Sequence, residues 1–251
     1  MRQALRLLGL AGPWLGLLAC AAGTTGRADA MAPEEPAPDP GVLAASAEGR
    51  ALRWATFGHG PRRVLLVGGI HGDEREGELA ARELPRAFLA QEGAAERATL
   101  VVIDDLNPDG SARKTRGNAR GVDLNRNFPA ASFVPSRAHG AEPLCEPETR
   151  ALAELVAGWR PELVVVLHSW RGAEFVNFDG PARELAARFA AASGMELRAS
   201  DDFEPTPGSF GSWAGATLGL PVLTIEFRRG RSPESAWELV RAALLAAVLE
   251  G

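Results

Sequence analysis

Four titratable side chains stand where apolar segments of the sequence end. His71 and Glu74 lie in "HGDE", directly after "RRVLLVGGI". His168 ends the run "ELVVVLH", and Glu226 lies in "LPVLTIEF". Two imidazoles and one carboxylate form a ligand set that binds zinc and leaves a fourth position for water. His71, Glu74 and His168 are therefore candidate ligands of a catalytic zinc ion, although each of these short motifs is common by itself.

Glu226 differs from an ordinary surface glutamate because Ile225 and Phe227 flank it. A carboxylate in an apolar strand is costly to bury without a partner. We therefore expect Glu226 to have either a charged partner or a chemical role.

The stretch "GVDLNRNFP", residues 121–129, places Arg126 between two asparagines. A guanidinium matches a carboxylate with two parallel hydrogen bonds, and the amide of Asn125 can add another donor. Such a stretch is also typical of a solvated turn. Together with a zinc site, this stretch indicates a binding site for the free carboxylate at the end of a peptide.

The elements that must position these residues alternate between strand and helix. Residues 51–58 and 62–70 are predicted to form a hairpin that leads into a buried strand. Further strands are expected over 98–106, 162–170 and 220–227, and helices over 76–93, 146–159, 181–194 and 232–250. Residues 107–143 are rich in Gly, Asn, Arg and Pro and are predicted to form a functional loop. The pattern predicts a single α/β domain with a mixed, mostly parallel sheet and helices on both faces.

The first residues are typical of export. Arg2 and Arg6 precede an apolar run over 7–19, and Cys20 follows it. Residues 1–30 are predicted to be a signal peptide. The stretch "LLAC" resembles a bacterial lipobox, which would attach the protein to a membrane through lipidated Cys20; cleavage after Ala30 is the alternative. We expect an exported protein, periplasmic or held at the outer membrane.

A Pro- and acid-rich linker over 31–40 is expected to lead to a catalytic domain over 41–251. The chain has 251 residues, enough for one substantial core. Its formal charge is −5 and Lys114 is its only lysine, so its charge composition does not indicate binding to a nucleic acid. The oligomeric state is not predicted.

Seven motifs occur in one order along the chain: "HGDE", "NPDG", "RKTR", "GVDLNRNFP", "EPET", "LHS" and "PVLTIEF". Together they resemble the zinc carboxypeptidase family. The form "NARGVDLNRNFP" and the stretch "TPGSFGSWAG" are most similar to the bacterial murein peptide amidase branch. The resemblance implies a zinc-carboxypeptidase-like fold and one zinc ion per chain, bound by the three candidate ligands.

The resemblance also implies roles around the metal. Asp123 would orient His71, and Asn125 and Arg126 would hold the carboxylate of the substrate. Glu226 would act as the general base that takes a proton from the attacking water and later delivers it to the leaving amine.

An arginine near the developing oxyanion is expected from the same resemblance. Arg113 of "RKTR" is the better match by motif, and Arg116 is the alternative. The digestive members of the family close a mobile tyrosine over the substrate, but this chain contains no tyrosine. Phe203, Phe210 or Trp213 could supply packing at most, and they are as readily interpreted as core residues.

The expected substrate is a murein peptide, cut between γ-linked D-glutamate and diaminopimelate. Asp201, Asp202 and Glu204 are candidates to receive the amine of diaminopimelate, although they are as readily a solvated loop. The alternatives are a general metallocarboxypeptidase, a deacylase of N-acyl amino acids of the aspartoacylase type, and a peptide-binding module without turnover.

Overall fold

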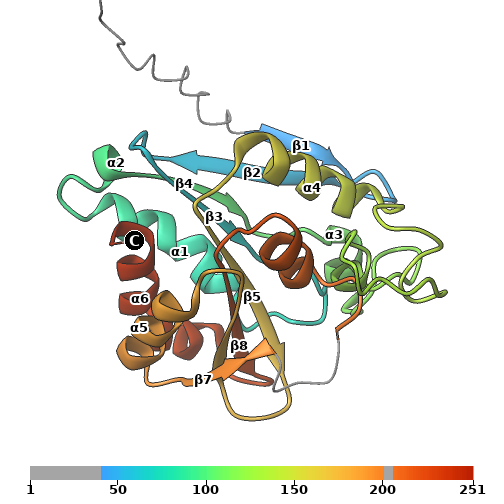
Figure 1. Ribbon diagram of the computed structural model, residues 1–251. Helices are drawn as coiled ribbons and strands as arrows, with labels where there is room; N and C mark the ends of the chain where they lie inside the picture. Colours follow the sequence, from blue (N-terminus) through green and yellow to red (C-terminus); the bar gives the residue numbers. More distant parts are fainter. Residues whose placement is uncertain (1–40, 201–205, 251) are drawn as a thin grey trace, which may run out of the picture. The chain divides into compact units, whose positions relative to one another are not determined.

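An eight-stranded mixed sheet forms the centre of the computed structural model, which describes residues 41–200 and 206–250 (Figure 1). The strands are β1 (Gly41–Ala45), β2 (Ala51–Phe57), β3 (Arg62–Val67), β4 (Ala98–Ile103), β5 (Leu163–Trp170), β6 (Phe175–Asp179), β7 (Glu196–Ala199) and β8 (Val222–Arg228). Their order in the sheet is β1-β2-β4-β3-β5-β8-β6-β7. The four central strands β4, β3, β5 and β8 run parallel. β2 is antiparallel to β1 and β4, whereas β6 is antiparallel to β8 but parallel to β7. The predicted fold class is confirmed.

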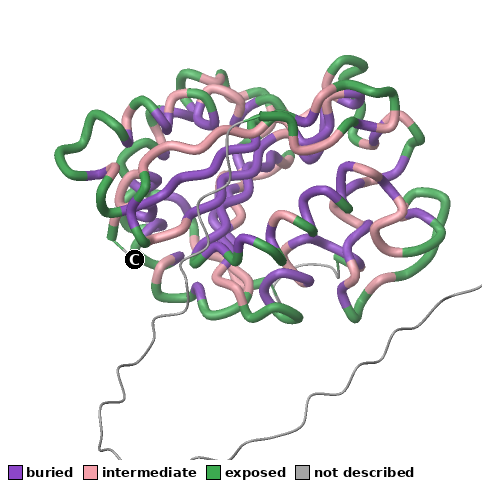
Figure 2. The backbone as a smooth tube through the Cα atoms, turned by 90° about the horizontal axis from the view of Figure 1, so that it is seen from above, coloured by how far each residue is buried: buried purple, intermediate pink, exposed green. Residues whose placement is uncertain are grey.

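Helices cover both faces of this sheet. They are α1 (Glu78–Leu89), α2 (Ala94–Arg97), α3 (Pro108–Arg113), α4 (Pro147–Trp159), α5 (Arg183–Ser193) and α6 (Pro233–Leu249). Successive side chains of a strand point to opposite faces. Val64 of β3 accordingly packs in the cluster that contains α1, α5 and α6, whereas Leu65 packs in the cluster that contains α4. Burial on both faces explains why the central strands are almost wholly apolar, and Figure 2 shows them as the buried middle of the domain.

The predicted hairpin of residues 51–58 and 62–70 is wrong, because β4 lies between β2 and β3. β4 is buried along its whole length, so it needs hydrogen-bonding neighbours on both edges. The connection after β2 crosses the start of β4, where His59 N donates to Ala95 O and Gly60 N donates to Ala98 O. β2 instead forms a hairpin with β1.

Part of the predicted loop over 107–143 is helical. In α3, the side chain of Asn107 accepts from Gly110 N and Pro108 takes the first position, which is a favourable start for a short helix. A 3-10 turn, η1, covers Leu124–Arg126. The strands β6 and β7 and the π-helix η3 (Ser212–Thr217) were not expected from the sequence. They are short, and pairing with β8 rather than local pattern determines the position of β6.

The predicted signal peptide over 1–30, with Cys20, and the linker over 31–40 lie outside the described residues. They remain predictions. Across 41–200 and 206–250, every helix is too short or too polar to span a bilayer.

Candidate metal centre

His71 and Glu74 lie in the turn that leads from β3 into α1. Glu74 N donates to His71 O over 3.1 Å, which curls the turn so that both side chains point the same way. Gly72 allows this turn to lie directly against α3, because a Cβ at this position would overlap the backbone of Gly110. The glycine of "HGDE" therefore brings the turn close to α3.

His168 and Glu226 come from the neighbouring strands β5 and β8. They are register partners in this parallel pair, near the carboxyl ends of both strands. In open α/β sheets, sites form at this edge. Strand pairing thus places two residues 58 positions apart in the sequence side by side.

The three predicted ligands lie together. His71 Nδ1 is 2.9 Å from Glu74 Oε1, and His168 Nδ1 is 2.9 Å from Glu74 Oε2. One ligand atom from each residue lies within 4.8 Å of the others. The three side chains are 2–4% exposed. Both imidazoles therefore turn their Nδ1 atoms toward the same carboxylate.

The far nitrogens of the two imidazoles also have neighbours. His71 Nε2 lies 2.9 Å from Asp123 Oδ1, and His168 Nε2 lies 3.2 Å from Asn125 Nδ2. Outer partners of this kind orient metal-binding histidines, and a carboxylate on the far nitrogen raises the basicity of the ring. Two converging imidazole nitrogens, a carboxylate and an outer Asp are a donor set that fits a zinc ion.

Charge within the cluster keeps its acids ionised. Burial by itself would raise the pKa of Glu74, but hydrogen bonds with His168 and His71 hold that pKa well below its usual range. Burial opposes ionisation of Asp123 as well, but the hydrogen bond with His71 and the charge of Arg116 hold the pKa of Asp123 low. The backbone N–H of Ser169 also donates to Glu74 Oε2, over 2.9 Å. The cluster therefore offers carboxylates in the form that a cation requires.

The structure separates the two predicted arginines. Arg116 Nη1 lies 3.0 Å from Glu74 Oε1, and its Nε lies 2.8 Å from Asp123 Oδ2. Arg113, at the end of α3, instead forms an ion pair with Glu48. The structure therefore brings Arg116 to the cluster and Arg113 to another surface, contrary to the preference drawn from the motif. Only two residues lie between them, and one of these, Lys114, ends α3 with a left-handed backbone.

A further arginine, Arg229, was not anticipated from the sequence. It follows β8, and its Nη2 lies 3.6 Å from Glu74 Oε1 and 3.0 Å from Asp73 Oδ2. Its only sequence signal was its place three residues after Glu226. Two guanidinium groups, Arg116 and Arg229, thus stand beside the ligand carboxylate.

Asn125 and Arg126 lie on η1, which Asp123 caps by accepting from Asn125 N over 2.9 Å. Asn125 Oδ1 accepts from Phe210 N over 2.9 Å, and Arg126 Nη1 donates to Asn125 O over 2.7 Å. Burial lowers the pKa of Arg126, although the charge of Asp123 opposes that shift. Asp123 therefore links the two predicted binding residues to His71 through one carboxylate.

Glu226 has an unusual electrostatic position. Burial raises the pKa of Glu226 to about 8, and the negative charge of Glu74 adds to the effect. A cation held by Glu74 would reverse the effect of the Glu74 charge and lower the pKa of Glu226, since a bound metal ion favours nearby carboxylates over carboxylic acids. Glu226 is therefore a group whose proton affinity depends on what the cluster binds.

A cavity of about 200 Å³ opens beside Glu226. Its walls come from η1, β5, β6, β8 and the chain around η3; the lining residues are Asn125, Trp170, Phe175, Asn177, Asp179, Ser200, Thr206, Ser209, Gly211, Thr224 and Glu226. Sequence reasoning missed its β6 wall because β6 itself was not predicted.

The aromatic residues considered from the sequence lie elsewhere. Phe210 and Trp213 are buried, with ring centroids 5.1 Å and 5.5 Å from that of Phe128, and they belong to the core on the α4 face. Phe203 lies outside the described residues, as do Asp201, Asp202 and Glu204. The aromatic walls of the cavity are instead Trp170 and Phe175.

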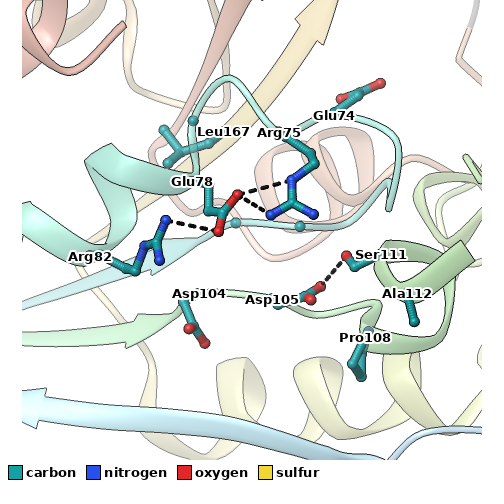
Figure 3. A pocket seen from close by; sticks show the side chains of 13 residues that line it. Glu74, Arg75, Glu78, Arg82, Asp104, Asp105, Pro108, Ser111, Ala112 and Leu167 are labelled. Atoms are coloured by element: carbon teal, nitrogen blue, oxygen red, sulfur yellow. Dashed lines mark hydrogen bonds and ion pairs between the residues drawn. The ribbon is translucent and has the colours of Figure 1, made fainter. Parts of the chain in front are cut away.

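A second cavity, of about 320 Å³, lies where the turn that carries Glu74 enters α1 (Figure 3). Glu78 bridges Arg75 and Arg82 along one wall, at 2.5 Å and 2.8 Å. On the other side Asp105 accepts from Ser111 Oγ over 2.9 Å. In Figure 3 the side chain of Glu74 points away from the Glu78 network. These ion pairs tie the turn to the first turns of α1.

Comparison with known proteins agrees with this geometry. The profile described as zinc carboxypeptidase, of peptidase family M14, matches residues 40–236. Murein peptide amidase A of Escherichia coli (strain K12) is 34% identical over 189 residues, which cover 68% of this chain and 74% of that protein.

Solved structures show the same similarity. The crystal structure of a murein-tripeptide amidase from Escherichia coli O157 aligns with a TM-score of 0.69 and 32% identity, over 88% of this chain and 96% of that chain. The bovine thrombin-activatable fibrinolysis inhibitor aligns with a TM-score of 0.68 over 84% of this chain and 88% of that chain, but at 19% identity. The latter likeness concerns the fold alone.

Proposed function

Because this chain belongs to the zinc carboxypeptidase family and is a metallopeptidase, we propose that it cleaves murein peptides at an amide bond next to a free carboxylate. The bond would join γ-linked D-glutamate to diaminopimelate. One observation carries the proposal: the His71, Glu74 and His168 cluster adjoins both Glu226, the strand partner of His168, and Asn125, which precedes Arg126. The names of the relatives at 34% and 32% identity support the choice of murein over other peptides.

His71, Glu74 and His168 would hold one zinc ion. When bound there, zinc supplies a Lewis acid that polarises the substrate carbonyl and makes water more acidic. The residues fit this role because their donors converge and the outer partner Asp123 is already in place.

Each of the remaining groups would have a separate role toward the substrate. Arg126 and Asn125 would bind the carboxylate of the leaving residue, which sets the scissile bond one residue from the end. Glu226 would accept a proton from the attacking water and pass it to the amine that leaves. The guanidinium of Arg116 would stabilise the negative charge that develops on the carbonyl oxygen.

Replacing Arg116 with Met is expected to lower kcat by about 10²–10³-fold, the effect of removing one donor from an oxyanion site. The matched change Arg113→Met should leave kcat within a factor of a few, because Arg113 pairs with Glu48 instead. Steady-state kinetics measure both variants. Arg116 also contacts Glu74 and Asp123, so zinc content is measured in parallel; loss of zinc in proportion to activity would show that Arg116 acts by holding the site instead.

We also propose that the protein is exported and meets murein in the periplasm, tethered through Cys20 or released after Ala30. The basic start, apolar run and "LLAC" stretch support this placement. Mass spectrometry of the N-terminus of the mature protein distinguishes a lipidated Cys20 from a free N-terminus at Met31.

The substrate is tested with the zinc-loaded protein on L-alanyl-γ-D-glutamyl-diaminopimelate and on an α-linked peptide with the same C-terminal residue. We expect release of diaminopimelate from the γ-linked peptide alone. Products are identified by mass spectrometry, and Glu226→Gln serves as the control for a contaminating peptidase. Release from the α-linked peptide alone would indicate a general metallocarboxypeptidase. Cleavage of N-succinyl or N-acetyl amino acids alone would indicate a deacylase, and no turnover despite bound zinc would indicate a binding module.

A further inference from the structure

Glu76 is a buried carboxylate that the chemistry described above does not use. It lies two residues after Glu74, and 9% of the residue is exposed. Its Oε2 accepts from Ser169 Oγ over 2.6 Å, and its Oε1 accepts from Gly230 N over 2.8 Å. Both of these partners, a hydroxyl and a backbone N–H, are neutral. Burial of a charge without an opposite charge is costly, which indicates a role for Glu76 other than packing.

The two hydrogen bonds of Glu76 join three segments around the metal centre. Glu76 itself lies in the turn between β3 and α1 that carries Glu74. Ser169 directly follows His168 in β5, and Gly230 lies just beyond the end of β8. One carboxylate therefore holds the carboxyl ends of β5 and β8 against the turn.

Ser169 connects Glu76 to the carboxylate of the ligand set. Its hydroxyl donates to Glu76, while its backbone N–H donates to Glu74 Oε2 over 2.9 Å. The same oxygen of Glu74 lies 2.9 Å from His168 Nδ1. A fixed position for Ser169 therefore fixes one oxygen of Glu74 beside the ring of His168.

The bend after β8 is held by the same turn at two consecutive residues. Arg229 Nη1 donates to Asp73 O over 2.5 Å, and Arg229 Nη2 lies 3.0 Å from Asp73 Oδ2. Gly230, the next residue, donates its backbone N–H to Glu76. Asp73 and Glu76, one on each side of the ligand Glu74 in the sequence, thus both bind this bend.

Gly77 allows Glu76 to come this close to the sheet. A Cβ at Gly77 would lie 2.9 Å from Leu167 Cβ and 3.1 Å from a ring carbon of Phe227, so a larger residue would force the turn or the strands to shift. Leu167 belongs to β5 and Phe227 to β8. The residue that follows Glu76 therefore permits close packing of the turn against the two strands that Glu76 joins.

We propose that Glu76 is a positioning residue for the metal centre, which acts through Ser169 to hold Glu74 in contact with both histidines. Its bond with Gly230 holds the end of β8 against the same turn. A site that is ordered before binding loses less conformational freedom when it binds its ligand. The inference rests on the proposed function only in taking His71, Glu74 and His168 as the zinc ligands.

The first test is the zinc affinity of the folded protein, measured with a competitive chelator. Glu76→Ala should weaken the affinity by about 10- to 100-fold, the range for loss of an outer partner. Ser169→Ala should weaken it as well, and the double variant should lose less than the two single losses combined, because both changes break the same contact.

Two conservative variants serve as controls. Glu76→Gln should keep most of the zinc affinity, because its amide oxygen can accept from Gly230 N and its amide nitrogen can donate to Ser169 Oγ. Glu78→Gln should keep the wild-type affinity, because the carboxylate of Glu78 pairs with Arg75 and Arg82.

A second measurement separates positioning from stability. The absorption spectrum of the cobalt-loaded protein reports the geometry of the ligands, and it should change in Glu76→Ala and return toward that of the wild type in Glu76→Gln. Melting temperatures are recorded for every variant. A lower melting temperature of Glu76→Ala with unchanged zinc affinity and cobalt spectrum would show a structural role alone and overturn the inference. If Glu76→Ala does not fold, unchanged zinc affinity in Ser169→Ala, which keeps the bond to Gly230, overturns it.

None of these measurements involves a peptide, so the identity of the cleaved bond does not affect them. Unchanged zinc affinity in Glu74→Ala would overturn the ligand set and this inference together. Unchanged affinity in Glu76→Ala and Ser169→Ala, beside a loss in Glu74→Ala, would overturn this inference and leave the proposed function standing.

Discussion

Glu226→Gln is expected to lower kcat/KM on the preferred peptide by about 10²–10⁴-fold, the range for a positioned acid–base group. Gln has the size of Glu but cannot accept a proton from water or return it to the leaving amine. Zinc binding should be unchanged, because the ligand cluster consists of His71, Glu74 and His168. The measurement is steady-state hydrolysis of the tripeptide together with the zinc content of the variant.

The pH dependence of kcat/KM is a second test of the role of Glu226. Glu226 must be ionised to accept a proton, so activity should fall as the pH drops through the pKa of this carboxyl. In the metal-free protein burial raises that pKa to about 8, and a bound cation should bring it lower. We therefore expect the acid limb of kcat/KM below pH 8, and its absence from the residual activity of Glu226→Gln. A variant with wild-type activity would refute the role of Glu226 as the base.

Removal of the metal is expected to abolish activity, and addition of zinc should restore it. Glu74→Ala should produce the same loss without recovery, because Glu74 contacts both histidines and is the carboxylate of the ligand set. Loss of an outer partner costs 10–100-fold in metal affinity, so the loss of a ligand should exceed about 100-fold. Titration with zinc in a competitive chelator measures the affinity directly, independent of activity.

Glu78→Gln is the matched control for this substitution. Glu78 lies four residues after Glu74 in the same segment and pairs with Arg75 and Arg82 instead of the histidines. The variant should keep its zinc affinity and most of its activity. Equal zinc affinity in Glu74→Ala and the wild type would remove Glu74 from the ligand set.

The largest error of the sequence interpretation was the pairing of residues 51–58 with 62–70. A short turn between two apolar runs is typical of a hairpin, but β4, about forty residues later, takes the place between them. Strand pairing is decided by burial of the whole sheet. A fully buried strand such as β4 is stable only with hydrogen-bonding neighbours on both edges.

The two candidate arginines show a smaller limit of prediction from the sequence. Arg113 and Arg116 lie three residues apart, and motif spacing favoured the former. The end of α3 at Lys114, in a left-handed conformation, turns the chain so that Arg116 reaches Glu74 and Asp123. One backbone conformation thus decides which guanidinium joins the cluster.

The sequence by itself determined the class of the domain and the chemical groups of the site. Apolar runs that end in His71, His168 and Glu226 reveal both, because periodicity and the cost of burying a charge are local properties. Only the tertiary structure decided which groups meet. The pairing of β6 with β8 places Asp179 in the same cavity as Glu226, and no local pattern records that contact, since it depends on hydrogen bonds between segments about fifty residues apart.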